Sequence, residues 1–249
     1  MATIDLNSDL GEGAGTEAAI MPLITSANIA CGAHAGDRHS MREAVALAKL
    51  HGVAVGAHPG YRDPANFGRK PLDIPSDELT ADLIAQLDVL SAIAASEGVP
   101  MAHVKAHGAL YNTAQHDPSV AAAIVAAVRA RASELVLFVF PGSAVERLAR
   151  AAGLRVAREG FIDRVYEPDG ALRSRAFADS LISDPARAAA QALSFMSDGG
   201  VRTRDGSFLE QGVDTLCVHG DTPGAPAILR ATRAALVAAG VRVERLRGR

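Results

Sequence analysis

The sequence predicts an α/β fold in which helices cover a parallel β-sheet. Short apolar runs alternate with longer helical patterns along nearly all of the 249 residues. Glycines stand where most of the helical patterns end, which is typical of helix C-termini. Because repeated strand–helix alternation is typical of parallel sheets, these two observations favour this fold class. Alternation alone leaves a closed barrel and an open doubly wound sheet as alternatives.

The elements follow one another in a regular order. Strands are expected at residues 3–7, 26–31, 53–58, 101–106, 135–140, 155–159, 214–218 and 242–246. Helices rich in Ala, Leu and Val are expected at residues 38–51, 76–98, 117–132, 142–153, 184–199 and 224–239. Ser76, followed by Asp77 and Glu78, indicates a helix start, because it offers a capping hydroxyl and acidic groups at the positive end of the helix dipole.

No shift in composition and no internal repeat divides the chain, so we expect one domain over residues 1–249. Two segments, 59–75 and 167–184, interrupt the alternation and are rich in Pro, Gly, Asp and Arg. They are expected to be long loops, and long loops in such folds often cover a functional site.

Composition narrows the possible partners and compartment. A net charge of −3 provides no electrostatic footprint for nucleic acid. The densest apolar run, residues 135–140, is too short to cross a bilayer, and the N-terminus lacks a secretory pattern. The two cysteines, Cys31 and Cys217, cannot form a disulfide framework. We therefore expect a cytoplasmic protein with no nucleic-acid and no membrane partner.

Polar residues gather at the expected carboxyl ends of the strands, where parallel α/β folds carry their chemistry. These residues are Asp5, Asn7 and Asp9, then Cys31, His34 and Asp37, then His58, then His103, Lys105 and His107, then Asp163 and Arg164, and finally Cys217, His219 and Asp221. Alternate residues of a strand share a face, so each of the longer groups is expected on one side of the sheet. Buried polar groups need partners, so they are expected to bind one another, a metal ion or a substrate, or to brace the end of the barrel.

Lys105 is unusual because the chain contains 22 Arg but only three Lys. A Lys held in a strand between two His indicates a need for a compact or tunable ammonium group. The cysteines are weaker signals and are expected to be small core residues. A zinc site from Cys31 with His34 and Cys217 with His219 is conceivable, although neither spacing matches a strong zinc pattern.

Several motifs for nucleotide binding and hydrolysis are missing. The glycine run from Gly11 to Thr16 lacks the third glycine of a dinucleotide fingerprint and carries Glu12 where phosphate would lie. The sequence has no P-loop and no nucleophile elbow of a serine hydrolase. Any nucleotide must therefore be held by a different device or by another chain.

The polar segments resemble the LamB/YcsF family in the same order along the chain. The resemblance rests on Asp5-Leu-Asn-Ser-Asp-Leu-Gly-Glu-Gly13, Ser26-Ala-Asn-Ile-Ala-Cys-Gly32, His34-Ala-Gly-Asp37, Gly56-Ala-His-Pro59, Phe67-Gly-Arg69, His103-Val-Lys105, His107-Gly-Ala-Leu-Tyr-Asn112 and His219-Gly-Asp221. It implies a seven-stranded barrel similar to the glycoside hydrolase/deacetylase folds, with the eighth expected strand peripheral. It also implies the activity of the A subunit of 5-oxoprolinase, which works with subunits B and C to cleave 5-oxo-L-proline to L-glutamate with ATP, the nucleotide carrying Mg.

The resemblance and the strand-end positions together define the expected site. The catalytic candidates are Asp9, His58, Lys105, His107 and Asp163. The candidates for binding substrate or nucleotide are Asn7, Glu12, His34, Asp37, Arg69, His103, Asn112, Arg164, His219 and Asp221. Whether a metal ion is bound stays open.

Opening a lactam with ATP needs three groups around the amide. Lys105 is expected to place a cation near the oxygen, Asp9 or Asp163 to act as base for water, and His58 or His107 to protonate the departing nitrogen. The alternative is a metal-dependent deacetylase or amidohydrolase that acts without ATP, since clustered Asp and His suit a divalent cation. A non-catalytic sugar or organic-acid binding protein is disfavoured, because aromatic residues make up only 4% and Trp is absent.

Overall fold

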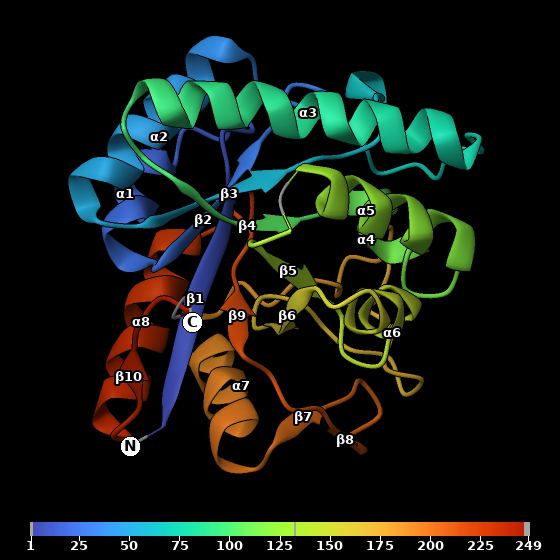
Figure 1. Cartoon of the computed structure of the whole chain (residues 1–249). Helices are drawn as coiled ribbons and strands as arrows, with labels where there is room; N and C mark the ends of the chain where they lie inside the picture. Colours follow the sequence, from blue (N-terminus) through green and yellow to red (C-terminus); the bar gives the residue numbers. More distant parts are fainter. Residues whose placement is uncertain (1, 132, 247–249) are drawn as a thin grey trace.

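The computed structural model describes residues 2–131 and 133–246, so the ends of the expected 1–249 domain and the last residue of the expected helix 117–132 lie outside the described residues. Seven parallel strands close into a barrel: β1 (Thr3–Leu10), β2 (Ser26–Ala30), β3 (Ala54–His58), β4 (Met101–Lys105), β5 (Val136–Val139), β6 (Arg155–Phe161) and β9 (Thr215–Cys217). Each strand pairs with the next, and β9 pairs with both β6 and β1, which closes the ring. The prediction of a seven-stranded barrel is confirmed, and the open sheet is excluded (Figure 1).

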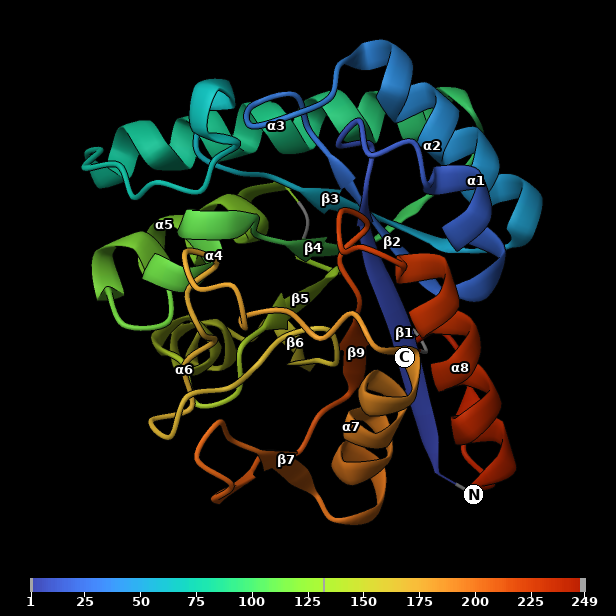
Figure 2. The same cartoon turned by 180° about the vertical axis from the view of Figure 1, so that it is seen from behind.

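The eighth expected strand is peripheral, as the resemblance implied. It forms β10 (Arg242–Val243), which pairs with the first residues of β1 at the amino end of the barrel. Helices α2 (Arg38–His51), α3 (Ser76–Ser96), α5 (Pro118–Arg131), α6 (Ala144–Ala151), α7 (Pro185–Ser197) and α8 (Ala225–Ala238) surround the strands (Figures 1 and 2). These six helices lie within two residues of the expected ranges at their N-termini and C-termini.

The structure adds short elements that the sequence did not predict. They are α1 (Glu17–Ile20), α4 (Gly108–Thr113), the 3₁₀ turns at Met21–Leu23 and Pro64–Asn66, and the antiparallel hairpin of β7 (Gly200–Arg202) and β8 (Phe208–Glu210). Each is too short to show a hydrophobic period, and the hairpin turn is polar. The short helix α4 matters for the site, because it begins directly after His107.

Successive side chains of β1 point alternately to the apolar layer outside the barrel and to the polar inside of the barrel. Ile4, Leu6 and Leu10 are buried in the apolar layer between strands and helices. The intervening side chains of Asp5, Asn7 and Asp9 are buried as well, but they bond to residues of β2, β4 and β9 across the inside of the barrel. The expectation of a polar strand face is therefore confirmed, and this polar interior positions the site.

Among the described residues, α3 is the one helix that is long and apolar enough to cross a membrane by length and composition. Its residues Leu79, Leu83, Leu87 and Leu90 are buried against the barrel, and it packs on α2, α5 and β3. The helix is therefore a core helix of this fold, and the apolar run at residues 135–140 forms the short buried strand β5.

Candidate functional site

A cavity of about 480 Å³ lies at the carboxyl ends of the barrel strands. Eight of the candidate residues line it: Asp9, His58, Arg69, Lys105, His107, Asn112, Arg164 and His219. The strand ends form the floor of the cavity, and α4 (Gly108–Thr113) forms one side. The loop from Ala171 to Ala176 forms part of its cover. The expectation that the segment 167–184 covers a site agrees with this position.

Beneath the cavity, amide and imidazole groups form a hydrogen-bonded network inside the barrel. The Asn28 amide donates to Asn7 Oδ1 and to Asp9 Oδ1, both at 2.8 Å. His103 Nε2 donates to Asn28 Oδ1 at 2.8 Å, and its ring stacks on Phe138. Burial lowers the pKa of His103 to about 3, so the ring is neutral. Asn7 and His103 therefore hold the floor of the cavity rather than line it.

Lys105 is the central cation of this interior and is only 2% exposed. Its Nζ lies 2.8 Å from Asp9 Oδ1 and 2.9 Å from Glu159 Oε1, and it donates to Cys217 Sγ at 3.1 Å. Burial by itself would lower the pKa of Lys105, but the two carboxylates outweigh it and hold that pKa well above 10.5. The ammonium is thus compact but not tunable, since it keeps its proton.

Asp9 joins this cation to the histidines of the cavity wall. Its Oδ2 lies 3.4 Å from His58 Nε2 and 3.9 Å from His219 Nε2. Burial would raise the pKa of Asp9, but the charges of His58 and Lys105 hold it well below 3.8. Asp9 is therefore an anion at the floor of the cavity, held in place by Lys105.

Asp163 lies behind His219 and does not line the cavity. Its carboxylate accepts from the backbone N–H and Nδ1 of His219, both at 2.9 Å, and from the Thr222 hydroxyl at 2.6 Å. Burial would raise the pKa of Asp163, but His219 lowers it to about 2. Because Nδ1 of His219 faces the carboxylate, its Nε2 is directed away from Asp163. A histidine oriented by a buried carboxylate is suited to proton transfer.

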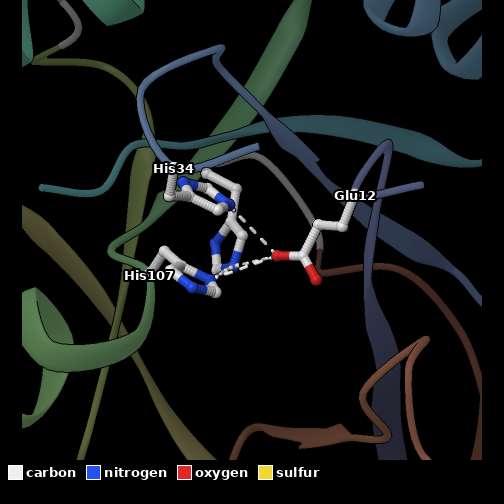
Figure 3. A group of neighbouring side chains, drawn as sticks. Glu12, His34 and His107 are labelled. Atoms are coloured by element: carbon white, nitrogen blue, oxygen red, sulfur yellow. Dashed lines mark hydrogen bonds and ion pairs between the residues drawn. The ribbon is translucent and has the colours of Figure 1, made fainter. Parts of the chain in front are cut away.

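A second cluster brings one carboxylate together with three imidazoles (Figure 3). Glu12 Oε1 lies 3.1 Å from His107 Nδ1, 3.2 Å from His34 Nε2 and 3.6 Å from His58 Nε2. The rings of His34 and His107 are stacked with centroids 3.7 Å apart. All four side chains are at most 5% exposed.

Burial and neighbouring charges shift the pKa of each of the four groups in this cluster. Burial lowers the pKa of His34 to about 4 and also lowers that of His107. Burial would lower the pKa of His58 too, but the Asp9 carboxylate outweighs it and the pKa is raised. Burial would raise the pKa of Glu12, but its close contacts with the rings of His107 and His34 hold it far below 4.5. The cluster is therefore an anion surrounded by imidazoles.

The mouth of the cavity carries arginines. Arg175 forms two hydrogen bonds to Asp221, at 3.1 and 3.2 Å, and Arg69 also pairs with Asp221. Arg164 is 6% exposed and donates to the backbone oxygens of Ser180 and Arg173, which ties the covering loop to β6. Burial lowers the pKa of Arg164, yet a guanidinium stays charged in proteins. The mouth is suited to an anionic ligand.

Asp37, which was expected to bind substrate or nucleotide, lies outside the cavity lining and caps α2. It is exposed, it does not line the cavity, and its carboxylate accepts from the backbone N–H groups of His39 and Ser40. Ser40 accepts a hydrogen bond from the backbone N–H of Asp37, which completes a capping box for α2. The position after a strand is shared by ligands and helix caps, so sequence position alone could not separate them.

Sequence reasoning missed four residues of the site. Glu159 pairs with Lys105, Asn28 joins Asn7 to Asp9, Arg175 pairs with Asp221, and Tyr111 lines the cavity from α4. Glu159 had a detectable signal, because it shares strand parity with buried Phe161. Arg175 had none, since it lies in an irregular loop far from its partner in sequence.

Both cysteines are buried, and their thiols are free. Burial raises the pKa of Cys31 to about 12 and that of Cys217 well above 9.0. Both remain protonated at neutral pH and are unsuited to nucleophilic attack. The interpretation of the cysteines as small core residues agrees with this, and Cys31 does not belong to the cluster that contains His34.

Comparison with known proteins agrees with this architecture. The LamB/YcsF family model matches residues 4–249. The 5-oxoprolinase A subunit of Symbiobacterium thermophilum is 50% identical over 245 residues, which cover 96% of this chain and 94% of that protein. The 5-oxoprolinase A subunit of Methylococcus capsulatus is 48% identical over 251 residues, or 99% of this chain and 96% of that protein. The crystal structure of a lactam utilization protein from Thermus thermophilus has a TM-score of 0.91 at 46% identity, covering 98% of this chain and 100% of that one.

The family match spans the whole barrel, from β1 to the segment beyond β10. The segments that carried the resemblance in the sequence lie around the cavity described above or support it from the barrel interior, except Asp37. The chain belongs to the LamB/YcsF family.

Proposed function

We propose that this chain is the A subunit of a 5-oxoprolinase and opens the lactam ring of 5-oxo-L-proline, giving L-glutamate with hydrolysis of ATP to ADP and phosphate. The observation that carries the proposal is the cavity itself. It joins the Lys105–Asp9 ion pair and the Asp163-oriented His219 beneath an arginine-bearing mouth. Relatives that are about half identical over nearly the whole chain carry the name of this enzyme.

Substrate binding follows from charge and size. The substrate is a small five-membered ring with one carboxylate, and a cavity of about 480 Å³ accommodates it with room for a further group. Its carboxylate would approach Arg164 or Arg175 at the mouth, and at Arg175 it would compete with Asp221 for the guanidinium. The lactam would then face Asp9 and His219 at the floor.

The chemistry needs activation, because an amide nitrogen is a poor leaving group. Transfer of the γ-phosphoryl group to the lactam oxygen breaks the bond to ADP and forms an imidate phosphate. Water adds to the ring carbon, the C–N electron pair passes to nitrogen, which takes up a proton, and a second water releases phosphate from the acyl phosphate. In this scheme Asp163 orients His219, which accepts the proton of water and then supplies it to nitrogen. This role was expected of His58 or His107, but backbone oxygens hold the outer N–H groups of both rings. Lys105 holds Asp9 and stabilises negative charge at the floor.

The assembly is part of the proposal. The names of the relatives place them in a multi-subunit enzyme, and we propose that subunits B and C complete such an enzyme around this chain in the cytoplasm. The sequence has no P-loop, so we propose that ATP with its Mg²⁺ is held with the help of these partners. The purified chain alone is then expected to be nearly inactive.

A glutamate-release assay tests the proposal. The assay compares three mixtures: the chain alone with ATP, the chain with its two partners and ATP, and the chain with its partners but without ATP. Only the chain with its partners and ATP is expected to release glutamate. In that assembly, Asp9→Asn and His219→Asn are expected to lower kcat by about 10²-fold or more. Brisk ATP-dependent ring opening by the single chain would contradict the proposed division of labour.

The Glu12 cluster favours a second candidate, a metal-dependent amidohydrolase or deacetylase that acts without ATP. Carboxylate and imidazole groups that converge beside a cavity suit a divalent ion that activates water. Hydrolysis of simple amides or acetylated substrates by the single chain, without ATP and abolished by a chelator, would select this candidate.

A further inference from the structure

We propose that Glu12, His34, His58 and His107 form a binding site for one divalent first-row transition metal ion, with Zn²⁺ as the best match to the ligand set. Three imidazole nitrogens and one carboxylate oxygen are ligands that Zn²⁺ accepts in four-coordinate sites. This inference concerns metal binding by the single chain and does not rest on the proposed activity.

The distances between the four ligand atoms match such a site. Tetrahedral bonds of about 2.0–2.1 Å to Zn²⁺ place the ligand atoms roughly 3.3–3.4 Å apart. Four of the six separations are 3.0, 3.1, 3.2 and 3.6 Å, for His107 Nδ1 to His58 Nε2 and for Glu12 Oε1 to His107, His34 and His58. The four atoms all lie within 4.8 Å of one another.

Proton positions show why a single hydrogen-bond network does not explain the cluster. His58 Nδ1 donates to the backbone oxygen of Lys105 at 2.8 Å, and His107 Nε2 donates to that of Phe67 at 2.9 Å. Their inner nitrogens therefore carry lone pairs when the rings are neutral. These lone pairs face each other at 3.0 Å and face a carboxylate at 3.1 and 3.6 Å. A proton added to one inner nitrogen would form a hydrogen bond across one of these contacts and leave the others without a donor. A metal ion at the centre would bind all of the facing lone pairs at once.

The outer hydrogen bonds have the form found around metal-binding histidines. A ligand histidine usually donates its other ring N–H to a carbonyl or carboxylate, which fixes its orientation. His58 and His107 both do so through backbone oxygens. Phe67, which receives the bond from His107, has φ of +56° and is the one non-glycine residue with positive φ among those that the structure describes. Such backbone conformations persist where the surroundings require them and are common at functional sites.

The segment after β3 clamps the two stacked rings. A Cβ added at Gly60 would lie 2.7 Å from His34 Nδ1, and one added at Gly68 would lie 2.7 Å from the Cβ of His34 and 3.1 Å from His107 Cδ2. Glycine at both positions therefore lets the backbone pack against the rings, and the rings cannot turn away from Glu12 without displacing this segment. The ligand set is rigid, which favours binding.

A second group of ligand-type side chains, Asp9, Cys217 and His219, is a poorer candidate. The ammonium of Lys105 lies 2.8 Å from Asp9 and 3.1 Å from Cys217, so a divalent ion there would meet a fixed positive charge. The Glu12 cluster has no such ammonium within its ligand set. This contrast allows the two groups to be separated by experiment.

The test uses the purified full-length chain without partners or ATP. It is stripped with a chelator and titrated with Zn²⁺ in a calorimeter, and bound metal is counted by mass spectrometry. We expect one Zn²⁺ per chain. Glu12→Gln and His107→Asn are expected to weaken binding at least about 100-fold, since even partners outside the ligand set cost about 10- to 100-fold. The matched control His219→Asn changes a histidine of the same cavity and is expected to keep wild-type affinity.

X-ray absorption of the Zn²⁺-loaded wild-type chain provides a measurement that needs no variant. Three imidazole nitrogens and one oxygen at about 2.0–2.1 Å are expected, with no sulfur. The inference is overturned if the wild-type chain binds no stoichiometric Zn²⁺ at micromolar concentrations or if sulfur appears among the ligands. It is equally overturned if folded Glu12→Gln and His107→Asn chains bind as well as wild type. Because no turnover is measured, failure here leaves the proposed lactam chemistry standing.

Discussion

At the scale of single residues, Lys105 explains why the chain departs from its usual choice of Arg. Two carboxylate oxygens and a sulfur surround Nζ between 2.8 and 3.1 Å. A planar guanidinium is larger and needs a forked set of partners, so it does not fit this shell. The sequence indicated a compact or tunable ammonium group, and the structure supports the compact one, because Nζ occupies a small enclosed space with two negative charges.

Lys105→Met is expected to destabilise the fold by about 3–5 kcal/mol, because it leaves the Asp9 and Glu159 carboxylates buried without their cation. Adding Glu159→Gln should recover part of this loss, since one of the two unpaired charges is then removed. Chemical denaturation of the single and double variants measures both effects. The exposed Lys70→Met serves as control and should change stability by no more than about 0.5 kcal/mol. A double variant no more stable than Lys105→Met would show that Glu159 is not paired as described.

Asp5 makes the stability of the chain depend on pH. Burial is the largest influence on it and raises its pKa from 3.8 to about 6, although the hydroxyls of Ser26, Thr215 and Thr25 oppose this. The folded protein therefore binds a proton more tightly than the unfolded chain does. The favourable effect of that proton is complete below about pH 4, and it is lost as the pH rises to about 6.

The comparison of wild type with Asp5→Asn isolates this effect, because the amide does not titrate. The stability of wild type relative to the variant should fall by on the order of 2–3 kcal/mol between pH 4 and pH 6.5 and stay level above that. Denaturant unfolding at several pH values measures the difference. A difference that stays constant across this range would mean that Asp5 titrates alike in the folded and unfolded states.

At the scale of elements, α2 shows that a residue predicted to bind substrate or nucleotide caps a helix. Asp37 ends the segment after β2, and its carboxylate and Ser40 satisfy the first backbone N–H groups of the helix. Gly52, with φ of +67°, ends the same helix in the left-handed conformation. The prediction that the helix ends at Gly52 is confirmed, because a helix stop depends on neighbouring residues only. Whether Asp37 binds a ligand depends on whether a cavity lies beside it, which neighbouring residues do not show.

Asp37→Ala is therefore expected to lower Tm by a few degrees and to leave ligand binding and turnover unchanged. Asp37→Ser is the matched variant, since a serine hydroxyl also caps a helix and should preserve Tm. Differential scanning calorimetry checks stability, and the glutamate-release assay of the assembled enzyme checks activity. Loss of turnover in Asp37→Ser at unchanged Tm would return Asp37 to the binding set.

At the scale of the whole molecule, the barrel brings together segments that are far apart in sequence. Glu12 follows β1, His34 follows β2, His58 ends β3 and His107 follows β4, so the cluster connects four consecutive strands. A metal ion bound there would link the first half of the barrel at its carboxyl end. The other half contributes Glu159, Asp163 and His219 from β6 and β9 and the turns after them.

Zinc is consequently expected to raise the thermal stability of the isolated chain. A ligand at 100 times its Kd stabilises the folded state by about 2.7 kcal/mol, which corresponds to a Tm rise of roughly 5–10 °C for a chain of this size. Thermal unfolding of the chelator-treated protein with and without Zn²⁺ measures the shift. Glu12→Gln should abolish it and His219→Asn should retain it. An equal shift in all three proteins would point to nonspecific binding instead.

The strands and helices of the barrel, and the polar face of its strands, could be predicted from the sequence alone. Hydrophobic alternation, helix-stopping glycines and the parity of Asp9 and Lys105 are properties of neighbouring residues, so they can be recognised without a structure. The family resemblance also followed from short contiguous segments. The hairpin of β7 and β8 was not predicted, since strands of three residues are too short to show a hydrophobic alternation.

Which of these polar residues lie in contact depends on the three-dimensional fold. Barrel closure pairs β9 with β1, two strands at opposite ends of the sequence, and this places Cys217 beside Lys105 and His219 near Asp9. It also separated Asp37 from the cavity and brought in Glu159. These outcomes depend on register and closure between distant strands, and no local pattern encodes the distance between two residues on different strands.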